Sequence, residues 1–480
     1  GAKPPKGQEL DDHYFGVIKP KVASFMEELN EELWKLGVFA KTEHNEVAPS
    51  QHELAPVFTT TNIAADHNQI TMELMQKIAK KHGMICLLHE KPFAGVNGSG
   101  KHNNWSIATD RGVNLLSPGE TPHENAQFLL FLVAVLRAVD DYQDLLRLSA
   151  ASAGNDHRLG AAEAPPAVVS VFLGDELTEV LRALEDDAPY NSSEKPLLRL
   201  GVHVLPKLPK DTTDRNRTSP LAFTGNKFEF RMLGSASSIS NTNTVLNTAV
   251  AESLRSFADE LEAAPDVHAA LHDLIRRTIR EHKRIIFNGN GYNETWIREA
   301  TEQRGLTNLP TTPDCIPCLL AEKNVRLFTL HKVFTEAELT ARTEIMLENY
   351  AKVLNIEAMT MIEMTLREIL PAIERFIGET ASAASAKKAL SPALDCQYET
   401  DLVAELSALC SGIHSACNKL RDDNGKAIRL TDAQARANAY RDHVIPQMEA
   451  LRALADKAET LVSSDLWPFP TYGELLFGIR

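Results

Sequence analysis

The sequence has few cysteines, no long apolar run and a deficit of positive charge. Its six cysteines are scattered over 480 residues, which is too sparse for a disulfide framework and predicts a reducing, cytoplasmic setting. The most apolar run, Phe128–Leu136, ends at Arg137 and is far too short to span a bilayer. The formal net charge of −15 argues against nucleic acid or an anionic membrane as a partner. No signal peptide is recognised, which agrees with a cytoplasmic protein.

Two of the cysteines, Cys315 and Cys318, form a CxxC pair. No second pair stands at the spacing of a zinc ribbon, so loop thiols are the favoured interpretation, with a metal or redox role as the alternative. The other four cysteines are expected to pack as small apolar side chains: Cys86, Cys396, Cys410 and Cys417.

Helical and extended patterns alternate up to about residue 330. Apolar spacing predicts helices at Phe25–Leu36, Asn62–His82, Glu124–Leu148, Asn241–Glu262 and Val267–Arg284. Short apolar or alternating runs predict strands at Phe39–Val47, Met84–His89, Asn103–Ala108, Val168–Leu173, Leu197–His203 and Phe228–Met232. Charges and turn formers in Pro206–Pro220 predict a surface loop, and no internal repeat is found.

Beyond about residue 330 the strand patterns disappear. Apolar spacing predicts helices at Glu336–Phe376, Tyr398–Leu420 and Thr431–Leu461, with separators at Gly378–Ala393 and Asp422–Lys426. An apolar stripe on the first of these helices is expected to pack in a core or against another subunit. We therefore divide the chain into residues 1–330, which carry the chemistry, and a helical region of residues 331–480.

The glycine-rich run Lys91–Ser106 is the most informative stretch of the chain. Gly95, Gly98 and Gly100 allow the backbone to approach a ligand closely or to adopt a positive φ, and successive N–H groups of such a loop can bind an anion. His102 follows on the predicted strand, where it could bind a metal beside that anion. The run is not a Walker A motif, because no Gly-Lys-Ser/Thr sequence closes it.

Two further segments add carboxylates and cations to this loop. The segment Glu43–Glu53 contains three glutamates around a proline turn. In the segment Lys227–Arg231, charged residues alternate with two phenylalanines, so a strand would place the charges on one face and the rings on the other. Carboxylates with an imidazole suit Mg²⁺ or Mn²⁺, and arginines suit phosphate and carboxylate. Together they predict a site for a metal, nucleotide phosphates and an acidic substrate.

In this order and at these spacings, the segments resemble the active-site segments of glutamine synthetase. The large type III branch resembles the chain best, through residues 1–7, Thr224–Arg231 and Leu466–Phe477. The resemblance implies an α+β fold, with a curved antiparallel sheet that carries the site, surrounding helices and a C-terminal all-helical region. It also implies ATP-dependent ligation of ammonia to glutamate through γ-glutamyl phosphate.

The resemblance assigns roles residue by residue. Glu46 and Glu53 match carboxylates of the first metal site, and His102 and Glu229 match ligands of the second. Asn97 and Gly98 match positions that hold the amino-acid end of glutamate. Glu43 has no match and is interpreted as a surface charge.

Other residues match the chemistry at the γ-carboxylate and the nucleotide. Arg158 would clamp the γ-carboxylate, and Glu163 would take a proton from ammonium. The residues matched to nucleotide, phosphate or substrate binding are Ser106, Asn104, Arg217 and Arg231. Ala222 stands where type I enzymes have a further arginine, and Arg215 or Lys227 is expected to compensate for it.

Members of this family carry an N-terminal β-grasp domain and two further metal carboxylates upstream of the position matching Gly1. We therefore expect part of the catalytic machinery to lie outside this sequence. The family also implies a homo-oligomer, a dodecamer of two hexameric rings with active sites between subunits. A γ-glutamyl-amine ligase that uses a polyamine, and a non-catalytic relative, remain the alternatives; a guanidino-kinase-like enzyme would lack the motif Asn45–Glu53.

Overall fold

The computed structural model describes residues 1–160, 164–188 and 218–478. Its central sheet has four strands in the order β3 (Gly100–Trp105), β6 (Phe228–Gly234), β5 (Leu221–Phe223) and β4 (Val171–Phe172). Strand β6 pairs antiparallel with both β3 and β5, whereas the two-residue strand β4 runs parallel to β5. The sheet is thus mainly antiparallel and is surrounded by helices, which confirms the α+β class.

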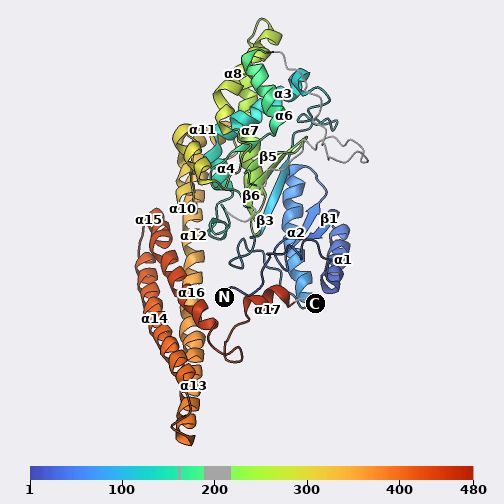
Figure 1. Cartoon of the computed structure of the whole chain (residues 1–480). Helices are drawn as coiled ribbons and strands as arrows, with labels where there is room; N and C mark the ends of the chain where they lie inside the picture. The colour runs from blue at the N-terminus through green and yellow to red at the C-terminus, as the bar shows by residue number, and fades with distance from the viewer. Residues whose placement is uncertain (161–163, 189–217, 479–480) are drawn as a thin grey trace.

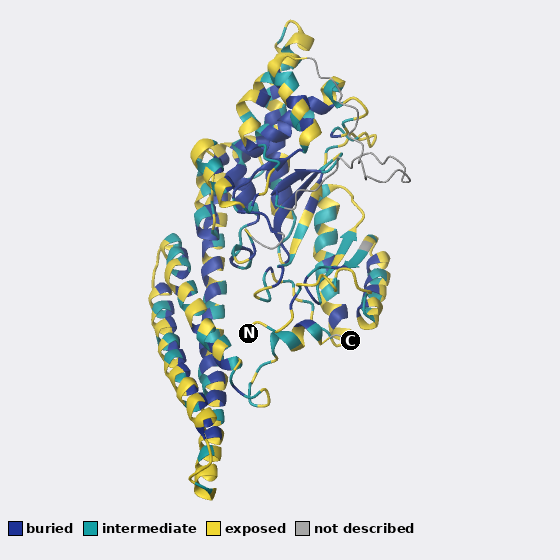
Figure 2. Ribbon diagram, viewed as in Figure 1, coloured by how far each residue is buried: buried dark blue, intermediate teal, exposed yellow. Residues whose placement is uncertain are grey.

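The sheet is anchored in the large core of the molecule (Figure 2). Phe228 and Phe230 of β6 are fully buried, as their alternation with charged residues predicts. On β3, Asn103 and Trp105 face helix α7 (Ser240–Glu262) and donate hydrogen bonds to its side chains. Helices α3 (Ala126–Asp141) and α8 (Val267–His282) pack against α7 and each other, and complete this core.

A smaller unit carries the segment rich in glutamate. Strands β1 (Ala40–Asn45) and β2 (His52–Pro56) form an antiparallel hairpin, next to helices α1 (Pro20–Lys35) and α2 (Thr61–Lys81) (Figure 1). Its own core is small and consists of Leu29, Leu33, Val38 and Ile78. The remaining short helices before residue 331 are α4 (Gln143–Ser149), α5 (Ala153–Asp156), α6 (Asp175–Asp186), α9 (Glu294–Arg298), α10 (Thr312–Cys315) and α11 (Glu322–Leu330).

Within the described chain, the part after residue 330 is helical, as predicted. Its helices are α12 (Glu336–Met364), α13 (Leu370–Leu390), α14 (Gln397–Ala427), α15 (Ala433–Ala439), α16 (Ile445–Glu459) and α17 (Tyr472–Phe477). Helices α13 and α14 lie side by side and extend away from the sheet (Figure 1). The boundary at residue 330 itself stays a prediction.

Of the two separators predicted in this region, Asp422–Lys426 is wrong and Gly378–Ala393 is right only at Ser391–Ala393, which lie between two helices. Helix α13 runs through Gly378–Leu390, because alanine is the strongest helix former and an Ala/Ser-rich run does not stop a helix. Helix α14 likewise continues through Asp422–Lys426, where the buried Asn424 and Ala427 keep it packed. Two prolines inside the helical region follow π-helical turns, at Thr365–Ile369 and Tyr440–Val444, which relieve the clash of a proline ring with the preceding turn.

Three further predictions need correction or lie outside the structure. Residues Met84–His89, predicted as a buried strand, do not form one, and Ile85 is 85% exposed, because an apolar run makes no ladder without a neighbouring strand. The helix predicted over Glu124–Leu148 is interrupted at Tyr142, between α3 and α4. Residues Leu197–His203 and most of the loop Pro206–Pro220 lie outside the described residues.

Across the residues that the structure describes, no helix has both the length and the apolar character that crossing a membrane requires.

Candidate functional site

The β1–β2 hairpin brings three potential metal ligands together. His44 lies opposite Glu53 in the antiparallel register, and Glu46 follows the end of β1. The ligand atoms of His44, Glu46 and Glu53 all lie within 4.8 Å of one another, and His44 Nε2 is 3.0 Å from Glu53 Oε2. Two carboxylates and an imidazole at this spacing fit a hard divalent cation.

Sequence reasoning missed His44, although the cross-strand register of a short hairpin could have found it. Burial alone would lower the pKa of His44, but the Asn45 carbonyl and the carboxylates of Glu46 and Glu53 together outweigh it and raise this pKa. His52 points to the other side, where burial lowers the pKa of its imidazole to about 4 and keeps it neutral. His13 lies against it at a ring distance of 5.2 Å and contacts the Glu46 carbonyl.

The sheet brings together the second predicted pair of ligands. His102 Nδ1 lies 2.8 Å from Glu229 Oε1, across the antiparallel strands β3 and β6. The register shifts between Lys101 and Asn103, so His102 sits at an irregularity of the ladder. The Glu229 side chain is 6% exposed and that of His102 is 39% exposed. One ligand is therefore fixed by the core, while the other reaches toward solvent.

Two of the three glycines in the loop Lys91–Ser106 lie against other groups of the protein, mainly Glu90 and Arg158. Only Gly95 of the three glycines has a positive φ, at +82°. A Cβ on Gly98 would lie 2.6 Å from the Glu90 carbonyl oxygen, and one on Gly100 would overlap the guanidinium of Arg158. The loop glycines thus leave room for Arg158 rather than for an open cavity. Asn97 is fixed by Gln8, whose side-chain amide exchanges two hydrogen bonds of 2.7 Å with it.

Arg158 is almost fully buried beneath this loop. Its guanidinium donates hydrogen bonds to the carbonyls of Arg231, Met232 and Leu233, all on β6, and to Asn155. Burial lowers the pKa of Arg158 to about 10, and the nearby carboxylate of Glu90 opposes this shift. The arginine is held on the same strand that carries Glu229.

Glu90 is a second residue that the sequence did not reveal. Its carboxylate is 4% exposed, accepts a hydrogen bond from the Ala236 amide and packs against Gly154 and Gly234. Burial lowers the pKa of the neighbouring Lys101 to about 8, again opposed by Glu90. Glu90 therefore balances the cations that gather beneath the loop.

The residues matched to the nucleotide occupy the edge of the sheet. Asn104 is exposed on β3, on the same face as His102. Ser106 Oγ lies within hydrogen-bond distance of two acceptors, Asn114 Oδ1 at 2.9 Å and the Asn226 carbonyl at 3.0 Å, and Lys227 directly precedes β6. Arg231 is 4% exposed. Three predicted site residues, Glu163, Arg215 and Arg217, lie outside the described residues.

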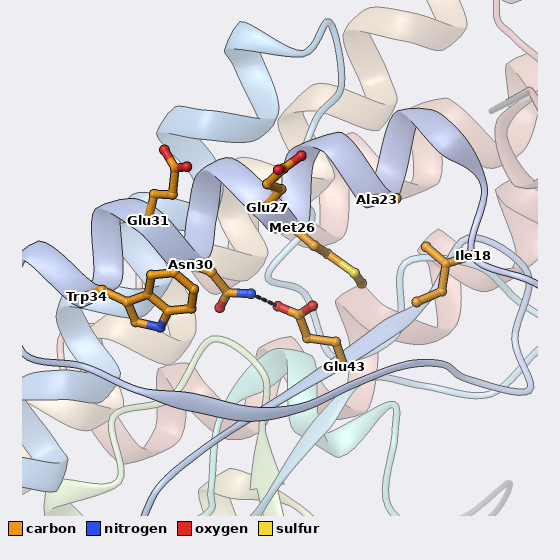
Figure 3. A pocket seen from close by; sticks show the side chains of 8 residues that line it. All are labelled: Ile18, Ala23, Met26, Glu27, Asn30, Glu31, Trp34 and Glu43. Carbon is orange, nitrogen blue, oxygen red and sulfur yellow. Dashed lines mark hydrogen bonds between the residues drawn. The ribbon is translucent and has the colours of Figure 1, made fainter.

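Two other features lie apart from this site. Cys315 ends α10 and Cys318 lies in the 3-10 turn that follows, so these thiols are not in a loop as predicted. Cys315 donates its thiol hydrogen to the Thr311 carbonyl, and burial raises its pKa to about 12, as expected for a packed thiol. A groove of about 370 Å³ lies between α1 and β1 and is lined by none of the predicted site residues (Figure 3). Glu43 lines it and accepts a hydrogen bond of 2.6 Å from Asn30.

Comparisons with known proteins identify the family to which the chain is similar. The glutamine synthetase catalytic domain model matches residues 5–164, and the glutamine synthetase C-terminal domain model matches residues 270–388. A Butyrivibrio fibrisolvens glutamine synthetase is 48% identical over the whole chain, which covers 68% of that protein. The type-3 glutamine synthetase of Dictyostelium discoideum is 44% identical over 99% of the chain and 66% of its own length. A solved Plasmodium falciparum glutamine synthetase aligns over 68% of this chain and 58% of its own, at 14% identity and a TM-score of 0.44.

The chain thus spans about two thirds of the length of the curated relatives it matches. ATP and a divalent metal are general requirements of their family. The match to a relative named for the type-3 branch covers 99% of this chain, which agrees with the motifs at both ends of the sequence. On this evidence the chain belongs to the glutamine synthetase family of ligases, which make glutamine from glutamate and ammonia with ATP.

Proposed function

We propose that the ligand sets on the hairpin and the sheet hold Mg²⁺ or Mn²⁺ for glutamine synthesis by this chain. The observation that carries the proposal is that both sets are formed: Glu46 and Glu53 meet at the hairpin, and His102 meets Glu229 across the sheet. The hairpin set combines two carboxylates with one imidazole, and the sheet set combines one carboxylate with one imidazole, and both ligand types suit these ions. Bound ions would screen the negative charges that keep a carboxylate away from the γ-phosphate of ATP.

In this proposal, different residues of the chain position the two ends of glutamate. Asn97 and Gly98 hold the amino-acid end, and Arg158 with Arg231 holds the carboxylates. A carboxylate oxygen leaves only after it has become a phosphate, so the γ-carboxylate first takes the γ-phosphoryl group of ATP. These groups act by orientation and charge, as is general for phosphoryl transfer.

Three residues are assigned to the phosphates and two to the nucleotide. Arg217 neutralises the transferred phosphoryl group, with Arg215 or Lys227 in place of the arginine missing at Ala222. Ser106 and Asn104 contact the nucleotide at the edge of β3. Glu163 takes a proton from ammonium, and the resulting ammonia attacks the acyl phosphate, which releases phosphate and forms glutamine.

Release of ADP tests the reaction. At its native length, the protein should release ADP only when glutamate and ammonium are both present, and the product should be glutamine. Putrescine should replace ammonium poorly, because a pocket built for a small cation leaves polar groups unpaired around a larger amine. Comparable rates with putrescine would move the chain to the γ-glutamyl-amine ligases, and the absence of any ADP release would contradict an enzymatic role.

We further propose that the chain works as a homo-oligomer in which neighbouring subunits complete the sites. Exposed apolar side chains in the N-terminal part of the chain support this proposal: Phe15, Val17, Phe58 and Ile85. Light scattering after gel filtration should show an assembly much larger than the 53.0 kDa chain. A stable monomer with full activity would contradict it.

A further inference from the structure

We propose that Asp156 is a positioning residue, which fixes Arg158 in the site and ties it to the C-terminal helices. The inference rests on the proposed function in so far as Arg158 is there assigned to glutamate. Asp156 ends helix α5, two residues before Arg158. None of its hydrogen bonds described below reaches a residue assigned to a substrate, so its contribution comes through the position of the turn.

The Asp156 carboxylate is held from two sides. Oδ2 accepts a hydrogen bond of 2.8 Å from the Thr312 amide, and Oδ1 accepts one of 2.9 Å from the Thr312 hydroxyl. Oδ1 also lies 3.3 Å from Arg147 Nη2. The Arg147 side chain is 1% exposed and donates further hydrogen bonds to the carbonyls of Leu309 and Pro310. A buried pair with this many bonds defines one geometry for the turn.

The neighbours of Asp156 fix the same turn to the sheet. Asn155 is fully buried and donates hydrogen bonds to the carbonyls of Ala150 and Met232, at 2.6 and 2.8 Å. Arg158 donates to the carbonyls of Met232 and Leu233. The turn is therefore clamped between β6 on one side and the Thr312 segment on the other. If Thr312 moved, Asp156 would move with it, and the turn Asn155–Arg158 would then displace the Arg158 guanidinium.

The Thr312 segment is in turn held by the helical region. Thr312 begins helix α10, and Asp314 caps this helix by accepting hydrogen bonds from Thr311. The other oxygen of Asp314 accepts a hydrogen bond of 2.7 Å from Arg441, in the π-helical turn after α15. Gln434 of α15 donates a hydrogen bond of 3.0 Å to the Pro313 carbonyl. Helix α10 thus links Arg441 to Asp156, and Figure 1 shows it beside the long helix α12.

Two substitutions test this link. Asp156→Asn keeps the size of the side chain but leaves the buried guanidinium of Arg147 without its charged partner. It should raise the KM for glutamate by about tenfold, because a small misplacement of a binding group can cost up to roughly a hundredfold. Arg441→Gln acts one step further away and should raise this KM by roughly threefold, while the KM for ATP changes less than twofold for both variants. The double variant should show less than the product of the two effects.

A matched control separates positioning from general destabilisation. Asp144 is also a buried carboxylate, on α4, and it accepts hydrogen bonds of 2.9 Å from Lys323 and Asn324. Asp144→Asn should lower the thermal midpoint as Asp156→Asn does, but leave the KM for glutamate unchanged. An equal rise of the KM in both variants, or no rise in Asp156→Asn, would overturn the inference.

Hydrogen–deuterium exchange tests the same link without turnover. In the turn, the amides of Arg158 and Leu159 donate to the Asn155 carbonyl. They should exchange faster in Asp156→Asn and in Arg441→Gln than in the wild type, and not in Asp144→Asn. Unchanged exchange in the first two variants would overturn the link even in an active enzyme. A wild-type protein that forms no glutamine would instead contradict the proposed function, and faster exchange would still support the link.

Discussion

The two ligand sets of this chain rest on very different scaffolds. His102 and Glu229 sit on strands of the central sheet, and every residue of β6 is buried. His44, Glu46 and Glu53 sit on a two-stranded hairpin whose unit has a core of four buried residues. Because a small core holds its groups less firmly, the sheet fixes Glu229 before any ion binds, whereas the ligands on the hairpin gain more order from the ion.

The largest loss of activity is expected from a substitution in the ligand set on the sheet, His102 and Glu229. Glu229→Gln keeps the side chain's shape beside His102 but removes its charge, so metal binding and charge screening are lost together. Glutamine formation should fall by about a thousandfold or more, which corresponds to roughly 4 kcal/mol of transition-state stabilisation. Steady-state rates at saturating substrates measure it, with circular dichroism to check the fold. Glu43→Gln is the control, because Glu43 lies on β1 and outside both sets.

A truncation in each core tests the difference in scaffold directly. Phe230 is fully buried on β6, and Phe230→Ala should lower the free energy of unfolding by about 3–5 kcal/mol. Leu54 on β2 is only partly buried against the hairpin core, so Leu54→Ala should cost about 1–2 kcal/mol. Urea denaturation of both variants checks this ranking. Equal losses would show that the hairpin is as firmly held as the sheet.

Binding of a divalent ion should order the β1–β2 hairpin more than the central sheet. Mn²⁺ at a hundred times its dissociation constant should stabilise the protein by about 2.7 kcal/mol. Exchange protection should increase more for amides of the β1–β2 hairpin than for those of β3 and β6. EDTA should reverse both changes. Greater protection in the sheet would mean that its ligands are the ones that the ion orders.

The smallest effect belongs to a surface ion pair. Hydrogen bonding to Arg255, with a further contribution from His331, lowers the pKa of Glu252 to about 2. Since this folded-state pKa lies below the ordinary value of 4.5, the carboxylate stabilises the fold above about pH 4.5, and this stability is lost as the pH falls toward 2. Glu252→Gln should therefore reduce stability by at most about 1 kcal/mol at neutral pH and flatten the acid limb of the stability curve. A steeper acid limb in the variant would contradict the assignment.

Sequence patterns predicted the features that depend on local spacing. The alternation of Lys227–Arg231 predicted buried rings and charges on the opposite face, and in the structure Phe228 and Phe230 are fully buried while Glu229 lies against His102. The long helices before and after residue 330 follow from apolar spacing in the same way.

Features that depend on partners distant in the sequence could not be predicted in this way. Glu90 shows no local pattern, yet the fold places it near Arg158 and Lys101. The link from Arg441 to Asp156 joins residues far apart along the chain through α10. The prediction of a buried strand at Met84–His89 failed for the converse reason, because this apolar run has no ladder partner within the described chain. Local propensity fixes an element only where tertiary contacts support it.

Counting bound Mn²⁺ tests the central claim most directly. Titration of the protein at its native length, followed by electron paramagnetic resonance or calorimetry, should show two ions per chain with different affinities. Glu53→Gln should lose or weaken one of them, Glu229→Gln the other, and Glu43→Gln neither. If Glu53→Gln and Glu229→Gln both bind Mn²⁺ with the stoichiometry and affinities of the wild type, the hairpin and the sheet do not hold the ions, and the account is wrong.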